Sequence, residues 1–398
     1  MGPIAQRLTC GHGKSPQACT IQEAPAIPLM TKIRFPACAG FHKAVKQRVE
    51  QYFMDSKLAK TGDWRMFMKT GVILLWLVIS YLILVFFSTS LVGAMLMIFA
   101  LAQGFALAGF NIAHDGAHDS YTKSKRINWL MGCTFDLLGG SQMLWRQKHN
   151  RLHHIYTNIY GADEDIDSSH GLLRLNPHQP WHPWHRFQHY YAFAMYSLLT
   201  LWWVTIGDFR KFFSGHIGHY KLRKPAGAEV GFFFFAKLFY FGYALILPCY
   251  FHPWLHVLLA FVGVHLILGL TLSVAFQLAH ISEHSSFPTP DAHTGMMPQA
   301  WARHTVETTA NFAPHNPWAT WYLGGLNFQI EHHLFANICH RHYPAISTIV
   351  AETCHEFAIP YVSYPTVRVA LAGHYRFLKT MGRRCNTLRE HAVVSEPI

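Results

Sequence analysis

The sequence predicts an all-α integral membrane protein with four transmembrane helices arranged as two hairpins, plus interfacial helices. Composition supports this: 51% of the 398 residues are hydrophobic, 15% are aromatic and only 14% are charged. A soluble domain carries about 25% charged residues, so a soluble protein with several buried core helices is a poor alternative. The aromatic content also excludes a disordered chain. Much of this chain must therefore face lipid.

Four long apolar runs supply the predicted spans. Each is long enough to cross a hydrocarbon core about 30 Å thick as a helix. The first hairpin covers residues 71–88 and 91–113, and the second covers residues 230–251 and 254–279. The third of these runs contains Lys237 and otherwise lacks charge. We therefore expect four crossings.

Basic residues set the expected orientation. They precede the first span, and a second basic stretch covers residues 210–224. The positive-inside rule places both segments, and the C-terminal part, in the cytoplasm. An even number of crossings is then needed after residue 113. The remaining apolar run, residues 190–206, is therefore expected to be interfacial or re-entrant, and residues 129–140 are another interfacial candidate.

The ends of the chain differ from the membrane part in composition. Residues 1–40 predict a flexible tail and lack the apolar core of a secretory signal. Residues 41–69 predict an amphipathic stretch lying along the membrane. We expect the membrane domain to cover residues 41–370 and a C-terminal tail to cover 371–398. The eight cysteines are scattered without a CxxC motif, which indicates reduced thiols.

The net charge of +12 raises the question of a nucleic-acid partner. The basic residues cluster beside the apolar runs, which is typical of a cytoplasmic membrane face and its anionic lipids. We therefore expect membrane lipid, and no nucleic acid, as a partner.

Many of the 29 histidines fall in short clusters at the predicted cytoplasmic ends of the spans. Residues four apart share one face of a helix, so such pairs can address one ion. The clustered residues are His114, His118, His149, His153, His154, His280, His332 and His333, with Gln329 one turn before the last pair. A single ion takes at most about six ligands of this kind. The set therefore predicts two metals in a histidine-lined cap on the cytoplasmic side.

The ligand type narrows the choice of metal. Catalytic zinc usually has three protein ligands and an open position, and the H-E-x-x-H motif is absent from this sequence. An almost purely nitrogen ligand set favours a pair of redox metals that bind dioxygen. An acyl chain rising out of the bilayer could present a C–H bond to such a pair.

The motifs HDGAH, HNRLHH and QIEHH resemble, in this order, the three histidine boxes of the membrane fatty-acid desaturases. The third motif opens with glutamine instead of histidine, and in this it resembles the motif of the front-end branch. Enzymes of that branch insert a double bond between an existing one and the carboxyl end. The segments TNIYGADEDID, FQLAH, TTANFA, GGLNFQIEHHLF and HYPAI strengthen the likeness. The resemblance runs from about Trp64 to Ala370.

The resemblance implies an oxidoreductase with two iron ions and O2 as co-substrate. It assigns the catalytic iron ligands to the box residues His114, His118, His149, His153, His154, His332 and His333. His280 matches the ligand that follows the last span, while Gln329 binds weakly, through water or not at all. His284 does not match a metal ligand of the family. Asp115 and Glu331 are expected to orient imidazole N–H groups rather than to bind metal.

The sequence departs from the family at two points. Ala336 stands where proline is frequent, which alters a local turn. No HPGG motif of a fused haem domain occurs. Electrons are therefore expected from a separate carrier, such as ferredoxin or a b-type cytochrome, that docks on the basic cytoplasmic face.

Several alternatives stay open at this level. A hydroxylase on the same scaffold would keep every histidine but insert oxygen. A metal transporter would place its ligands at mid-membrane, unlike these clusters. The acyl carrier is either CoA or a lipid. Five aromatic residues near the clusters either line a substrate tunnel or simply pack helices: Phe110, Trp145, Phe276, Phe312 and Trp321.

Overall fold

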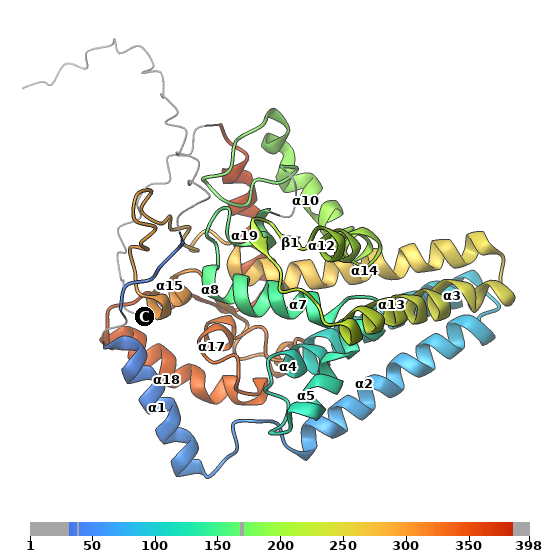
Figure 1. The fold of residues 1–398 in the computed structure, drawn as a ribbon, viewed down its shortest axis with the longest axis horizontal. Helices are drawn as coiled ribbons and strands as arrows, with labels where there is room; N and C mark the ends of the chain where they lie inside the picture. Colours follow the sequence, from blue (N-terminus) through green and yellow to red (C-terminus); the bar gives the residue numbers. More distant parts are fainter. Residues whose placement is uncertain (1–31, 38–39, 168–170, 385–398) are drawn as a thin grey trace, which may run out of the picture.

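The computed structural model describes residues 32–37, 40–167 and 171–384, and this part of the chain is mostly helical. Four long helices run away from a wider cap built of shorter helices and loops (Figure 1). Most of the tail expected at residues 1–40 lies outside the described residues. The four cysteines that are described are free: Cys133, Cys249, Cys339 and Cys354.

The first hairpin contains α2 (Trp64–Leu82) with the π-helical turn η1 (Ile83–Phe87), then α3 (Leu91–Ala108), η2 (Gly109–Ala113) and α4 (His114–Ala117). Ser90 caps α3, because its side-chain oxygen accepts a hydrogen bond from the backbone N–H of Gly93 at 3.1 Å. By length and composition the candidate spans are Trp64–Phe87 and Leu91–Ala117. Both predicted spans are confirmed, and the first begins earlier than expected.

The second hairpin contains α13 (Gly227–Phe241), η6 (Gly242–Ile246), η7 (Pro248–Tyr250) and α14 (Trp254–His280). Its candidate spans, Gly227–Tyr250 and Trp254–His280, confirm the second predicted pair. Helix α14 packs against α3. Their buried side chains, including Phe105 and Leu268, contribute to one continuous apolar core.

The remaining apolar run forms a bent helical segment. It comprises η4 (Pro183–Phe187), α10 (Gln188–Ser197), α11 (Leu199–Trp202), η5 (Trp203–Gly207) and α12 (Asp208–Ser214). The part before the bend, Pro183–Ser197, and the part after it, Leu199–Ser214, meet at 50°, as in a re-entrant loop or a broken span. Residues 129–140 contain the end of α5 (Lys125–Gly132), the short helix α6 (Thr134–Leu137) and the loop after it. Neither is long enough to cross a membrane alone.

Short elements complete the cap. The described helices are α1 (Phe41–Ser56), α7 (Gln142–Lys148), η3 (His149–His153), α8 (His154–Tyr156), α9 (Glu164–Asp167), α15 (Trp301–Glu307), α16 (Pro317–Tyr322), α17 (Gln329–Leu334), η8 (His340–His342), α18 (Tyr343–Glu356) and α19 (Val367–Met381). Strands β1 (His216–Ile217) and β2 (Tyr220–Lys221) pair antiparallel, whereas β3 (Asn311–Phe312) and β4 (Ser363–Tyr364) pair parallel.

Both ends of the described chain pack onto the rest of the protein. The apolar face of α1, including Val45 and Val49, packs on α18 in a buried cluster. Residues 64–69 belong to the first spanning helix. Helix α19 runs through the expected boundary at residue 370, and its Phe377 and Leu378 are buried. The packed region therefore extends to Met381.

Close packing at Gly116 joins α4 to α5. A Cβ atom at Gly116 would lie 2.4 Å from the backbone nitrogen of Gly132, whereas one at Gly71 would meet nothing within 4 Å. We predict that Gly116→Ala costs about 1–3 kcal/mol of stability, as overpacking does. It also displaces the histidines on either side. Melting temperature and metal content in detergent should both fall. Gly71→Ala is the matched control, and equal values for the two variants would contradict the prediction.

Candidate metal centre

All eight clustered histidines are buried and come together in the cap. Helix α4 and the residue after it carry His114 and His118, and α14 ends at His280. The turn η3 and helix α8 carry His149, His153 and His154, and α17 carries His332 and His333. The predicted site residues are thus assembled from four separate parts of the chain.

The ring nitrogens form two neighbouring groups. Within each group the nitrogens lie within 4.8 Å of one another: His114, His118, His149 and His332 form one, and His153, His280 and His333 form the other. His154 makes a further group with His332 and His333, so it lies between the two. Its Nε2 atom is also 3.1 Å from Nε2 of His149. This arrangement fits two adjacent metal ions.

The unpaired nitrogens test whether these residues fit a metal. Among the eight clustered histidines, the buried Nε2 atoms of four have no hydrogen-bond partner: His114, His118, His332 and His333. Leaving one buried polar atom unsatisfied costs about 1–3 kcal/mol. A metal ion would accept these lone pairs directly. The donor set therefore fits a metal cofactor.

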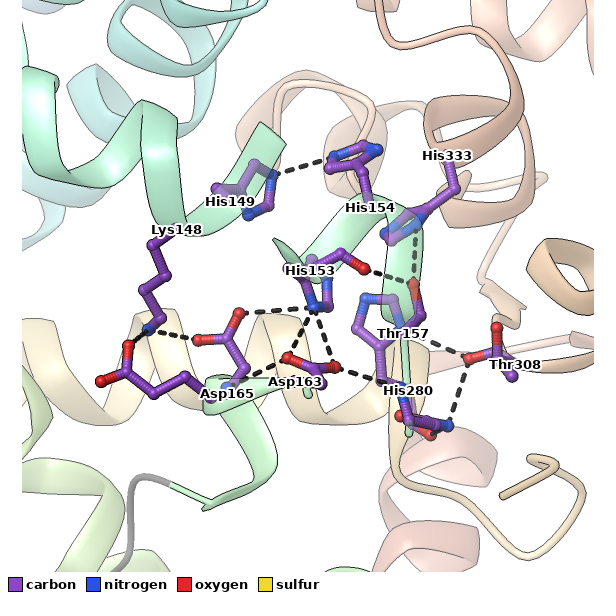
Figure 2. Close-up of polar contacts among 12 residues, drawn as sticks. Lys148, His149, His153, His154, Thr157, Asp163, Asp165, His280, Thr308 and His333 are labelled. Atoms are coloured by element: carbon purple, nitrogen blue, oxygen red, sulfur yellow. Dashed lines mark hydrogen bonds and ion pairs between the residues drawn. The ribbon is translucent and has the colours of Figure 1, made fainter. Parts of the chain in front are cut away.

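The opposite ring nitrogen, Nδ1, is held by a neighbour in several cases (Figure 2). Nδ1 of His153 lies 3.2 Å from the Asp163 carboxylate and 3.4 Å from that of Asp165. The other contacts join His333 Nδ1 to Thr157 Oγ1 at 3.4 Å, His280 Nδ1 to the Thr308 carbonyl at 3.4 Å, and His332 Nδ1 to Tyr343 Oη at 3.2 Å. Such partners fix the tautomer and the ring orientation of metal ligands.

The two acidic residues expected to support the imidazoles behave differently. An Asp115 carboxylate oxygen lies 2.8 Å from Nδ1 of His340, and the other lies 3.9 Å from Nδ1 of His114. Glu331 instead accepts hydrogen bonds from Asn311 at 2.8 Å and Tyr361 at 2.9 Å. Its expected role is therefore corrected: Glu331 ties α17 to β3 and to the segment before β4.

The two residues left uncertain by the sequence are now placed. Gln329 is buried, and its side chain hydrogen-bonds His280 beside the second group. His284 lies outside the cluster: its side chain is 61% exposed and 3.8 Å from Glu283. Metal binding by Gln329 stays a prediction, whereas His284 is not positioned as a ligand.

The five aromatic candidates divide between the site, the core and the surface. Trp145 stacks on the ring of His149 with 4.2 Å between centroids. Phe110 contacts Phe276 in the core, and Phe312 is buried. Trp321 is 43% exposed. Trp145 is thus the candidate that touches the metal centre directly.

Burial controls the protonation of the site. Burial and then neighbouring imidazoles hold the pKa well below its usual value at His149, His154, His332 and His333. At His153 burial acts the same way, but the nearby carboxylate of Asp163 outweighs it and raises the pKa. Neutral imidazole is the form that binds metal. The cluster is therefore prepared for metal at neutral pH.

Sequence reasoning missed several supporting residues. Asp163 and Asp165 lie in TNIYGADEDID, and Tyr343 lies in HYPAI, so the motifs contained them without indicating a role. Thr157 opens the same TNIYGADEDID motif, which gave no sign that it contacts His333 from 176 positions away. His340 and Cys339 also join Asp115 in a buried group at the edge of the site.

The four candidate spans and the buried imidazole groups define a membrane protein with a histidine-lined site that could hold metal. The chain belongs to the fatty acid desaturase family, whose sequence pattern matches residues 88–365. The resemblance inferred from the three histidine motifs is thereby confirmed.

The chain is similar over most of its length to several characterised relatives. It is 36% identical over 359 residues to sn-1 linoleoyl-lipid 6-desaturase of Synechocystis sp., covering 88% of this chain and 98% of the relative. It is 40% identical over 347 residues to acyl-lipid (8-3)-desaturase of Physcomitrium patens, covering 86% and 72%. The enzyme of the same name from Mortierella alpina is 33% identical, with coverage of 88% and 79%. These are front-end desaturases, which confirms the predicted branch.

Asp163 should tune the second metal group through His153. We predict that Asp163→Asn weakens metal binding about 10–100-fold, because loss of such a partner has this effect on ligand orientation and basicity. Equilibrium metal content, measured against a chelator series, provides the test. Asp119→Asn is the control, because Asp119 pairs with Arg146 and is half-exposed. Equal metal retention in both variants would show that the His153 contact is unimportant.

Acid should release the metal and weaken the fold. The unfolded chain takes up protons on histidine as the pH falls through about 6.5, while the buried histidines with lowered pKa stay neutral. The unfolded state then binds more protons, so the free energy of unfolding decreases as the pH drops below about 6.5. His153 opposes this trend, because its raised pKa favours the folded state in acid. Metal content and melting temperature should both decline between pH 7.5 and 5.5. A flat profile would refute this expectation.

Proposed function

We propose that this fatty acyl desaturase uses two iron ions and dioxygen to insert a cis double bond into the acyl chain of a membrane lipid. The new bond would lie between an existing double bond and the carboxyl end. The observation that carries the proposal is the pair of adjacent imidazole groups with inward, unpartnered Nε2 atoms. The relatives support the substrate class, since their names specify a linoleoyl-lipid or an acyl-lipid.

The residues divide naturally between two ions. His114, His118, His149 and His332 would hold the first, and His153, His280 and His333 the second. His154 lies where it can serve either. Imidazole ligands suit iron, and bound iron would supply the activation of dioxygen. Gln329, hydrogen-bonded to His280, would position this ligand, and direct binding of iron by Gln329 stays a prediction.

The overall chemistry requires an external electron source. Two adjacent methylenes each lose one hydrogen, and one O2 becomes two waters. The balance needs two electrons and two protons besides the two substrate hydrogens. We infer a separate carrier, a ferredoxin or a b-type cytochrome, that docks on the cap. Exposed lysines on α1, such as Lys43 and Lys46, support an acidic partner there. The basic flanks of the spans support a cytoplasmic active site.

The protein's own residues hold the substrate and keep water away from the reacting carbons. Trp145 stacks on His149 and makes edge contacts with His114 and His118, with centroids 5.6 and 5.7 Å apart. It also packs with the buried apolar residues Ala113, Ala117 and Phe135. This wall offers an apolar surface next to the imidazoles. A chain held along it would present one methylene pair for oxidation.

A hydroxylase on the same scaffold is not favoured, because the relatives named above are desaturases. The two reactions share every ligand and differ only in the product. Product analysis therefore distinguishes them.

Expression in yeast fed defined fatty acids tests the proposal. We expect new cis double bonds, located by mass spectrometry, on the carboxyl side of existing ones. His153→Ala and His332→Ala should abolish them, because each removes a metal ligand. His284→Ala is the matched control, since this exposed histidine lies outside the cluster. Hydroxylated products, or activity retained in either ligand variant, would overturn the proposal.

A further inference from the structure

A buried ion pair lies deep in the membrane part of the protein. Nζ of Lys237 on α13 is 2.7 Å from a carboxylate oxygen of Asp208 at the start of α12, and both side chains are at most 4% exposed. Lys237 is ten residues into its span, about 15 Å along the helix. Charged residues at such depth are costly unless paired, and they frequently mark functional positions.

Every polar group of this ion pair has a partner. The Lys237 ammonium also donates to the carbonyl oxygen of Gly139 at 2.6 Å and lies 3.4 Å from that of Val204. The second oxygen of Asp208 accepts a hydrogen bond from the indole N–H of Trp203 at 2.9 Å. The pair therefore fixes α13, α12, the turn η5 and the loop after α6 in one arrangement.

The residues fixed in this way form one side of a small apolar pocket. Trp203, Val204 and Gly140 line it, together with Phe135, Phe105 and Leu272. Its free volume is about 30 Å³. Trp203 is held by Asp208, Val204 faces Lys237 through its carbonyl, and Gly140 follows the residue that Lys237 binds. The ion pair thus determines the shape of this wall.

An aromatic series connects the pocket to the metal centre. The Trp203 and Phe135 rings are 6.2 Å apart, Phe135 and Trp145 are 4.5 Å apart, and Trp145 stacks on His149 at 4.2 Å. The geometry of helix α14 also relates the pocket to the metal centre. Leu272 precedes His280 on α14 by eight residues, about 12 Å along the axis. The pocket therefore lies below the metal site, toward the middle of the membrane.

We propose that Lys237 and Asp208 are positioning residues that select which methylene pair of the acyl chain reaches the metal centre. They act through Trp203, which they fix in the wall of the apolar pocket, and the methyl end of a bound chain would extend past this wall. A displacement of this wall changes how far the chain enters, and so moves the site of oxidation. One methylene of misfit in an apolar pocket changes discrimination between substrates by about 10–200-fold. The inference rests on the proposed function.

Two variants test the inference without leaving an isolated charge. Trp203→Phe keeps an aromatic ring but removes the indole N–H. The double variant Lys237→Met, Asp208→Leu removes both charges with similar volume, which is often tolerated, whereas breaking one side alone strongly destabilises. Tyr196→Phe is the control. It removes one buried hydrogen bond, to His374 at 3.0 Å, and Tyr196 does not line the pocket.

The readout is the ratio of products by double-bond position and chain length, from cells fed a mixture of fatty acids. We expect this ratio to shift by at least about threefold in both test variants, a fraction of what a misfit methylene can produce. Metal content should match the wild type. An unchanged ratio in Trp203→Phe and the double variant, even with lower yield, would show a merely structural role and overturn the inference. A wild type that makes no unsaturated product would contradict the proposed function itself.

Discussion

The structure depends on burying eight imidazoles whose ring nitrogens converge in neighbouring groups. Burial lowers the pKa of His149, His154, His332 and His333 and so favours their neutral form. Carboxylate, hydroxyl or carbonyl neighbours hold several of the rings at Nδ1. Without a metal, unpartnered nitrogens would weaken the fold. Metal binding therefore contributes to folding as well as to chemistry, and the cap and its cofactor form one unit.

The helices meet this demand with local distortions. The π-helical turns η2 and η3 directly precede α4 and α8, and η3 itself contains His149 and His153. In a regular α-helix, His149 and His154, five residues apart, would point in different directions. A π-turn has about one more residue per turn and brings such a pair onto one face. Their Nε2 atoms accordingly lie 3.1 Å apart. Backbone irregularity here builds the site.

The sequence was most informative where one physical signal dominates. Long apolar runs identified the four spans, and clustered histidines identified the ligands. The sequence did not predict which residues contact the ligands through tertiary folding, such as Thr308 at His280 and Tyr343 at His332. Hydrophobic periodicity does not distinguish a lipid-facing surface from a protein-facing one, so the packing of α1 on α18 could not be predicted. Glu331 beside the ligands was assigned to them, although its partners come from other loops.

A desaturase must solve two opposed solvation problems within a few ångströms. Its metal ligands need polar, hydrogen-bonded neighbours, whereas its substrate is a hydrocarbon. Trp145 separates the two environments: one face covers His149, and Phe135 packs against the same indole. From there the apolar residues continue to Trp203, whose indole N–H is anchored by Asp208. A purely apolar contact would leave this wall free to slide. A hydrogen-bonded ion pair in a medium of low dielectric fixes it instead, because any displacement exposes an unpaired charge.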